Sequence, residues 1–322
     1  MKIERISSCR AIDKRFFWQI VFEWEDIFSR EMGIPIWEEP KVSVNPHAFR
    51  LPILDDIVLL GKGNLFRYDL SAGNYNFWNN HKVLPCIIDF NLTKKKIAGF
   101  ERAYSKHKQV LISSLEAYVF LKENNTRLPI AHLPLSISDK YKITGETRFE
   151  KKFDLVLMGR QNSVLMGFLK EYAKKHPDFV YVLRKDTKSF SYYTSTGELV
   201  GNIITREDYM HLTQQARCAL YATQGIDGEH EWRNGYNQVT PRWLELIASG
   251  CHVIARYPEN VDTKYYNMEH IASSCDSYCD FELKLDKARN ESADMEKYSE
   301  YLSCHYSSNR VAMLKDILNK IS

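Results

Sequence analysis

The chain has 322 residues, which is the length of about two domains of 100–200 residues each. Its composition, with 44% hydrophobic and 26% charged residues, 14 Gly and 10 Pro, excludes a disordered chain, a collagen-like repeat and a coiled coil. Forty-four basic residues against 41 acidic ones give a net charge of +3, so charge offers no reason to expect a nucleic-acid partner.

No apolar run approaches the roughly 20 residues that span a bilayer, and the charged start of the chain is unlike a secretion signal. We therefore expect a cytoplasmic protein. Seven cysteines, an odd number in a long chain, indicate reduced thiols. Because the spacing of Cys275, Cys279 and Cys304-His305 fits no zinc pattern, we expect no metal there.

In the first half, short apolar runs alternate with amphipathic stretches, which predicts parallel strands joined by helices. Helices are expected at 16–29 and 115–123, and strands at 2–7, 56–60, 84–89, 109–113 and 129–133. The strand candidates lack a clean alternation of apolar and polar residues, as is typical of a sheet covered on both faces.

A polar stretch at 136–149 is the expected linker, and the alternation restarts after it. Helices are expected at 163–175, 208–216 and 240–249, a helical tail from about 295 to 321, and strands at 153–158, 179–183, 218–222 and 251–255. The sequence thus predicts an α/β protein of two Rossmann-like domains, 1–145 and 146–322.

The 224–256 segment carries the strongest chemical signal. A strand is followed by a long polar loop, and Thr240 and Pro241 then begin a helix, since Thr is favoured as the N-cap and Pro in the first turn. Such a helix start at the carboxyl edge of a parallel sheet suits a phosphate or diphosphate. Glu245, in an otherwise apolar part of this helix, is either a ligand for a ribose diol or a solvated surface acid.

The stretch VTPRWLELIASGCHVIA resembles the donor-site helix of GT-B glycosyltransferases, in particular bacterial family-1/family-4-like enzymes. Other stretches agree in order: LPIAHLPLSISDKY resembles the end of their first domain, FDLVLMGR and HPDFVYVLR the start of their second domain, and CHYSSNR their closing segment. The resemblance covers about 109–320. It implies two domains that face each other across a cleft, with the C-terminal helix packed on the N-terminal domain.

The resemblance also assigns residues to a donor site. Glu245 would hold the ribose, and Asn237 occupies the place of an earlier Glu that lies near the donor sugar. Glu229 and Glu231, acids of the same loop, are the candidate substitutes for that Glu. The diphosphate clamp and its surroundings would comprise Gly159, Arg160, Arg184, Gln238, Val239, Thr240 and Arg242. Because Asn237 is an amide, retention of the anomeric configuration stays open, and an inverting enzyme would need a base such as Asp89 or His81.

The implied activity is a hexosyltransferase-type transfer of a sugar from a nucleotide-sugar to a glycan or lipid-linked acceptor, in surface polysaccharide or glycoconjugate synthesis. The reaction would be metal-independent, and the nucleotide-sugar would be a co-substrate, with no cofactor. A nucleotide-sugar epimerase of the same fold and a non-catalytic sugar-nucleotide-binding module are the alternatives. The oligomeric state stays open.

Candidate acceptor-binding residues lie in the first half: Gly61 and Lys62 in a Gly-x-Gly loop, Trp78 in an aromatic neighbourhood, and His81. The alternative interpretation of this Gly-x-Gly loop is an ordinary turn at the end of a strand. The basic and aromatic stretch 14–18 either rests peripherally on the inner face of the membrane or belongs to an ordinary packed helix.

Overall fold

The computed structural model describes residues 1–39, 63–70, 76, 78–185, 189–228 and 236–321. The chain forms two compact units, Met1–Asp139 with Ser307–Ser322, and Lys140–Tyr306. The chain first passes between the units inside the polar 136–149 stretch. The expected domains were 1–145 and 146–322. In the structure, the last segment, Ser307–Ser322, belongs to the first unit, as the resemblance implied for the C-terminal helix.

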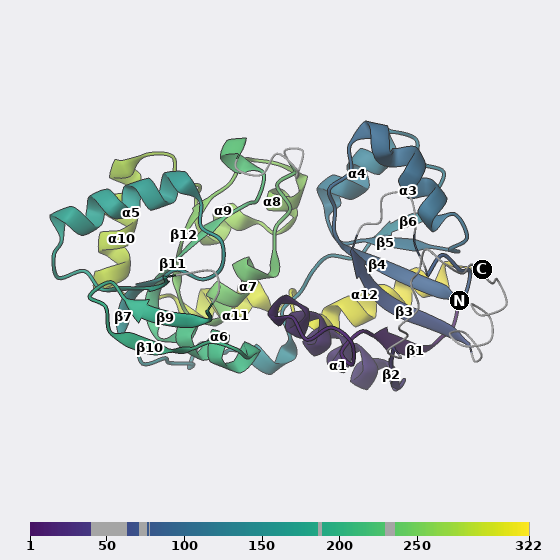
Figure 1. Cartoon of the computed structure of the whole chain (residues 1–322), viewed down its shortest axis with the longest axis horizontal. Helices are drawn as coiled ribbons and strands as arrows, with labels where there is room; N and C mark the ends of the chain where they lie inside the picture. The colour runs from purple at the N-terminus through teal and green to yellow at the C-terminus, as the bar shows by residue number, and fades with distance from the viewer. Residues whose placement is uncertain (40–62, 71–75, 77, 186–188, 229–235, 322) are drawn as a thin grey trace. The chain divides into compact units, whose positions relative to one another are not determined.

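The first unit is built on a six-stranded sheet whose strands all pair in parallel, in the order β2-β1-β3-β4-β5-β6 (Figure 1). Its strands are β1 (Ile3–Ser8), β2 (Ile36–Glu38), β3 (Asn64–Leu70), β4 (Val83–Asp89), β5 (Val110–Ile112) and β6 (Ile130–His132). Its helices are η1 (Phe16–Trp18), α1 (Gln19–Met32), η3 (Lys94–Lys96), α3 (Ile97–Tyr104), α4 (Leu115–Glu123), η4 (Asp139–Tyr141, which extends across the division between units) and α12 (Ser307–Asn319).

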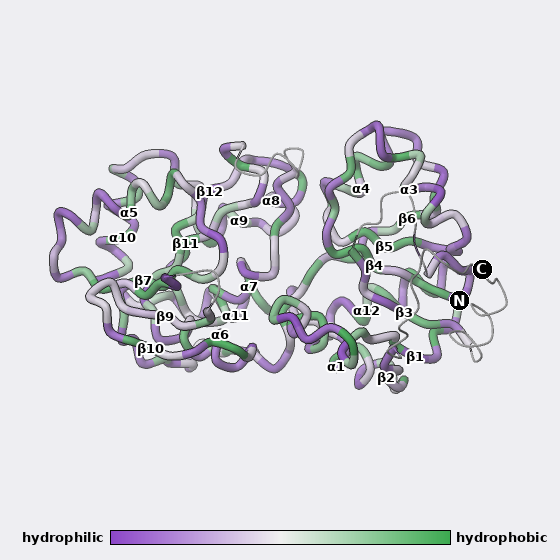
Figure 2. The backbone as a smooth tube through the Cα atoms, viewed as in Figure 1, coloured by the Kyte–Doolittle hydropathy of each residue, from purple (hydrophilic) through white to green (hydrophobic). Residues whose placement is uncertain are grey.

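Helices α1 and α12 cover one face of this sheet. Their apolar side chains meet those of β1, β3 and β4 in one core, which includes Trp24, Phe28, Phe66, Val311 and Leu314. Figure 2 shows hydrophobic segments in the strands of this sheet, interspersed with hydrophilic ones. Each Å² of apolar surface that these side chains bury stabilises the folded state by about 25 cal/mol. Because Val311 and Leu314 belong to this core, α12 contributes to the stability of the first unit.

A buried carboxyl group joins α1 to the carboxyl end of β1. The Ser8 hydroxyl donates to Glu25 at 2.5 Å, and the Arg10 guanidinium donates to the same oxygen at 3.0 Å. Glu25 is 2% exposed, and burial raises its pKa to about 7 despite these donors. Because the pKa in the folded protein exceeds the ordinary value of 4.5, the stability that this group contributes is fully present below about pH 4.5 and is lost as the pH rises through 7.

Glu25→Gln is therefore expected to stabilise the protein at alkaline pH. The neutral amide removes a desolvation cost of about 3 kcal/mol at pH 8 but only about 1 kcal/mol at pH 5. Denaturant unfolding of both proteins at the two pH values measures the difference. Glu31→Gln, which replaces an exposed acid of the same helix, is the matched control. A stability difference that does not vary with pH would show that Glu25 is not the titrating group.

The second unit is built on a six-stranded sheet in the order β10-β9-β8-β7-β11-β12. Its strands are β7 (Phe153–Val156), β8 (Tyr181–Arg184), β9 (Ser191–Thr194), β10 (Leu199–Asn202), β11 (Ala216–Ala222) and β12 (His252–Arg256). Its helices are α5 (Ser163–Lys175), α6 (Arg206–Gln214), η5 (Ile226–Gly228), α7 (Pro241–Ala248), α8 (Val261–Tyr265), α9 (Met268–Ile271), α10 (Tyr278–Asn290) and α11 (Met295–Leu302).

Four strands of this sheet, β7, β8, β11 and β12, pair in parallel, as expected for a Rossmann-like domain. Strands β9 and β10 were not predicted and run antiparallel, β9 to β8 and β10 to β9. A tight turn at Gly197, whose φ is +105°, makes this hairpin possible, because glycine adopts positive φ without a steric cost. The hairpin extends the sheet beyond β8. Within the described residues, no helix is long and apolar enough to cross a bilayer.

Candidate functional site

Four arginines lie at the carboxyl edge of the second sheet. Arg160 follows β7, Arg184 ends β8, Arg206 is the first residue of α6 and Arg242 is the second residue of α7. The parallel strands β7, β8 and β11 end at this edge, which is where open α/β sheets bind ligands. The sequence predicted three of these residues as part of a site.

Arg242 is held directly over the turn that follows β7. A β-carbon on Gly159 would lie 2.5 Å from Arg242 Nη2, and Arg242 Nη1 donates to the Arg160 carbonyl at 2.8 Å. Gly159 has a φ of +67°, so a side chain is disfavoured there both by backbone conformation and by this contact. Arg242 forms no ion pair with the described residues.

Two buried tyrosines lie near the arginines. Burial raises the pKa of Tyr192, while the charges of Arg184 and Arg242 and a backbone hydrogen bond from Gly159 oppose the rise. Burial and the nearby Glu245 carboxylate likewise raise the pKa of Tyr209, against the charges of Arg242 and Arg206. Each phenol is thus near two guanidinium groups, which connects Arg184, Arg206 and Arg242. Arg160 joins them through its backbone carbonyl, which accepts from Arg242. We call Arg160, Arg184, Arg206 and Arg242 the arginine cluster.

Glu245 is enclosed. Its side chain is 5% exposed, Arg206 Nη2 donates to its Oε1 at 2.5 Å, and the Tyr209 hydroxyl also bonds the carboxylate. The Arg206 guanidinium lies 4.8 Å from the centre of the Tyr209 ring. The interpretation of Glu245 as a solvated surface acid is therefore wrong, because burial in an ion pair replaces solvent. Its contact with a ribose stays a prediction.

Arg206 is the residue of this candidate site that the sequence analysis did not assign. A local signal exists. The Thr205 hydroxyl accepts from the Asp208 backbone, and Asp208 in turn accepts from Thr205, so the pair forms a capping box. A Thr followed three residues later by Asp marks a helix start, and Arg206 therefore stands in the first turn of α6. Tyr192 and Tyr209 were missed as well.

The start of α7 offers fewer free amides than expected. Thr240 takes the N-cap position and Pro241 follows it, as predicted, but the Thr240 side chain caps no backbone amide. The backbone N–H of Thr240 donates to the hydroxyl of buried Tyr221 at 3.0 Å, and Val239 is 1% exposed. The expectation that the Thr240 amide binds phosphate is corrected accordingly, because this phenol already occupies it.

The loop before α7 is partly buried. The side-chain carbonyl oxygen of Asn237 accepts a hydrogen bond from the Thr223 hydroxyl at 2.7 Å, and Asn237 is 8% exposed. Gln238 is half-buried beside it. A catalytic role for Asn237 stays a prediction, and Glu229 and Glu231 lie outside the described residues.

Asp227 fixes the beginning of the same loop. Its carboxylate accepts from Arg256 Nε and Nη2 at 2.8 and 2.7 Å and from Asn162 Nδ2 at 2.8 Å. Asn162 also caps α5. Asp227 has a φ of +59°, which is unusual for a non-glycine residue, and the ion pair holds it there. The loop after β11 is thus anchored to β12 and α5 at the same edge as the arginine cluster.

The candidate residues of the first unit do not converge. Asp89 ends β4, whereas exposed His81 precedes the first residue of that strand, Val83. Since a strand advances about 3.3 Å per residue, the two lie at opposite edges of the sheet and do not belong to one site. The Arg67 guanidinium lies 5.0 Å from the centre of the Trp78 ring, and Trp78 also packs on Trp37. Gly61 and Lys62 lie outside the described residues.

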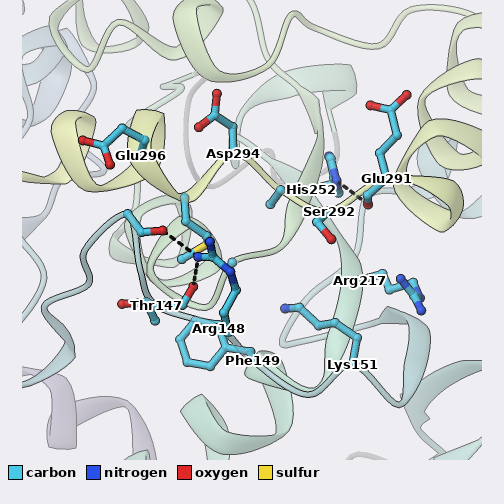
Figure 3. Close-up of a pocket in the computed structure, with 14 residues that line it drawn as sticks. Thr147, Arg148, Phe149, Lys151, Arg217, His252, Glu291, Ser292, Asp294 and Glu296 are labelled. Carbon is cyan, nitrogen blue, oxygen red and sulfur yellow. Dashed lines mark hydrogen bonds between the residues drawn. The ribbon is translucent and has the colours of Figure 1, made fainter.

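A cavity of about 300 Å³ lies elsewhere in the second unit, at the amino ends of β7, β11 and β12 (Figure 3). Two of its basic side chains are held by backbone carbonyls: Lys151 donates to Ser249 at the end of α7, and Arg148 donates to Gly145 and Thr147. Burial lowers the pKa of Lys151. The cavity is therefore distinct from the arginine cluster. Among the described residues, no three His, Cys, Asp or Glu side chains are grouped as a metal site requires.

No protein-family model matches the sequence, and neither does any curated protein. Solved structures do. A sucrose-phosphate synthase from Thermosynechococcus elongatus matches with 9% identity and a TM-score of 0.59 over 99% of this chain and 98% of that one. AviGT4, a glycosyltransferase involved in avilamycin A biosynthesis, matches with 11% identity and a TM-score of 0.56 over 98% and 92%.

The pneumococcal O-GlcNAc transferase GtfA, solved with UDP and GlcNAc, matches with 13% identity and a TM-score of 0.44 over 80% of this chain. This chain spans about half the length of these relatives: it covers 52% of GtfA and 53% of the matching chain in a GtfA/B complex. The two full-length matches show that this chain has the GT-B fold, as the sequence predicted.

Proposed function

We propose that this chain is a glycosyltransferase that moves a sugar from a nucleotide-sugar to a glycan or lipid-linked acceptor in surface polysaccharide or glycoconjugate synthesis. The observation that carries the proposal is Arg242, a guanidinium without an ion-pair partner among the described residues and held over Gly159 at the carboxyl edge of the sheet. The fold, which sucrose-phosphate synthase and AviGT4 share, supports the same conclusion.

The chemistry follows from charge. When the bond between sugar and nucleotide breaks, negative charge develops on the departing diphosphate. Arg160 in the turn after β7, Arg242 in the first turn of α7 and Arg184 at the end of β8 would stabilise that charge by charge-assisted hydrogen bonds. Because guanidinium groups are permanently protonated, this stabilisation requires neither a metal ion nor a proton transfer at the leaving group.

Binding and turnover test the proposal separately. Calorimetry of the full chain with the common nucleoside diphosphates is expected to reveal one that binds, and its sugar conjugates are expected to release the diphosphate when an acceptor panel is added. Absence of binding by every nucleoside diphosphate would overturn the proposal. A changed sugar without an acceptor would identify an epimerase, and tight binding without turnover a binding module.

Gly159→Ala is expected to weaken nucleoside diphosphate binding about tenfold. The added methyl group would occupy the place of Arg242 Nη2, 2.5 Å away, and force the guanidinium off the turn. The positive φ costs a further 1–2 kcal/mol or so of stability. Calorimetry measures the first effect and thermal unfolding the second. Gly197→Ala, also at positive φ but with no atom nearer than 3.9 Å to the new carbon, is the control for strain alone. Equal losses of binding in both variants would contradict the role of Arg242.

A further inference from the structure

The cavity of Figure 3 brings basic residues from three strand starts together in the second unit. Lys151 precedes β7, Arg217 is the second residue of β11, and His252 is the first residue of β12. These strand starts lie at the edge of the sheet opposite the arginine cluster. A ligand in this cavity is therefore different from the proposed donor, and an inference about it does not depend on the proposed function.

Lys151 and Arg217 carry two positive charges close to each other. The Lys151 ammonium group donates to the Ser249 carbonyl at 2.9 Å and lies 5.4 Å from the centre of the Phe149 ring. Neither Lys151 nor Arg217 forms an ion pair with the described residues. Burial lowers the pKa of Lys151, and the positive charge of Arg217 also acts to lower it. An anion between the two groups would offset their mutual repulsion.

The three carboxylates that also line the cavity are directed to other groups. Asp294 caps α11 by accepting from a backbone N–H at 3.0 Å. Glu291 forms an ion pair with Lys287 at 3.7 Å, and the Glu296 carboxylate lies against Gly145, where a β-carbon would collide with it. In Figure 3 these carboxylates lie in the upper half of the view, and the two cations lie in the lower half. The acids therefore do not neutralise the cations.

His252 adds little charge to the pair of cations. Its Nε2 lies within hydrogen-bond distance of the Glu291 carbonyl, at 3.1 Å. Burial lowers the pKa of His252 below its ordinary value of 6.5, against the effect of this hydrogen bond. The imidazole is therefore mostly neutral at pH 7, and the positive charge on this side of the cavity is that of Lys151 and Arg217.

We propose that this cavity binds a phosphate group, carried by inorganic phosphate or by a small phosphate monoester, between Arg217 and Lys151. A phosphate monoester carries about −1.5 to −2 charges at pH 7 and offsets both cations, whereas a carboxylate offsets one. The planar guanidinium group can donate to two phosphate oxygens at once. The volume of about 300 Å³ is at the lower end of the range for small-molecule sites, which suits a ligand smaller than a nucleotide.

Protection of Lys151 from acylation tests the proposal on the parent protein. An amine-acylating reagent at pH 8, followed by mass spectrometry, reports the labelling of each lysine. Inorganic phosphate is expected to halve the labelling of Lys151 at about 1 mM, because the bound anion covers the amine and favours its protonated form. The adjacent Lys152, whose side chain is 49% exposed, is the control and keeps its labelling. Equal protection of both lysines, or no protection of Lys151 up to about 50 mM phosphate, would overturn the proposal.

Arg217→Gln and Arg242→Gln separate this cavity from the arginine cluster. Half-protection of Lys151 is expected to need at least tenfold more phosphate in Arg217→Gln and to stay within twofold of the parent value in Arg242→Gln. Calorimetry with inorganic phosphate in the Arg242→Gln background gives a second measurement, in which adding Arg217→Gln should abolish binding. Equal shifts in the two single variants, or phosphate binding that the added substitution leaves unchanged, would overturn the proposal.

Glycerol 3-phosphate distinguishes the two sources of the phosphate group. If it protects Lys151 at a lower concentration than inorganic phosphate does, the cavity holds a phosphate monoester, whereas protection by inorganic phosphate alone assigns the cavity to the free ion. Glycerol without phosphate is expected to leave the labelling unchanged. Protection by glycerol equal to that by glycerol 3-phosphate would contradict binding through the phosphate group.

Discussion

Arg242→Gln is expected to weaken binding of a nucleoside diphosphate about 100-fold and to leave the free energy of unfolding within about 1 kcal/mol of the parent. Two charge-assisted hydrogen bonds from one guanidinium contribute about 3 kcal/mol, and each 1.4 kcal/mol is a factor of ten in affinity. Within the described part of the chain, the substitution removes a single hydrogen bond, from the guanidinium to the Arg160 carbonyl, so the fold is little affected.

Arg217→Gln is the matched control for this experiment. Arg217 lies at the start of β11, at the opposite edge of the same sheet, and lines the cavity of Figure 3. Its side chain makes no hydrogen bond or ion pair with the described residues. Calorimetry should show parent-like affinity in this variant, and an equal loss in the two variants would mean that overall charge, not the position of Arg242, attracts the nucleotide.

Arg206→Met is expected to destabilise the second unit by about 3–5 kcal/mol, because it leaves the Glu245 carboxylate buried without its cation. The double variant Arg206→Met, Glu245→Met should recover most of that loss, since two apolar side chains of similar volume carry no desolvation cost. Chemical unfolding of the parent, both single variants and the double variant measures the coupling. Additive losses in the double variant would contradict an ion pair that is maintained in the folded protein.

Periodicity predicted the long elements well. The helices at 163–175 and 115–123 have the predicted bounds, and the strands β1, β4, β11 and β12 lie within a few residues of their predicted ranges. These segments are long enough for an apolar pattern to be recognised. The hairpin of β9 and β10 was not predicted, because four-residue strands such as Ser191–Thr194 carry little pattern and depend on pairing with a neighbour for their stability.

The helix expected at 240–249 was placed correctly, but the hydrogen-bond partners of its polar groups were not predicted. Sequence spacing indicates that Glu245 and Thr240 lie on α7, yet it carries no information on which distant side chains reach them. Arg206 lies 39 residues from Glu245, and Tyr221 lies 19 residues from Thr240. Both contacts arise from the packing of α6 and β11 beside α7, and such tertiary contacts decide which polar groups remain open to a ligand.

The return of α12 to the first unit has a consequence for the order of folding during synthesis. Residues 140–306 form a contiguous unit, whereas the first unit lacks α12 until the ribosome has passed residue 319. Val311 and Leu314 belong to the same core as Trp24 and Phe28, so those aromatic side chains remain partly uncovered while most of the protein is made. Of the two units, the one whose translation begins first is therefore completed second, and a fragment that stops before Ser307 would expose an apolar face prone to aggregation.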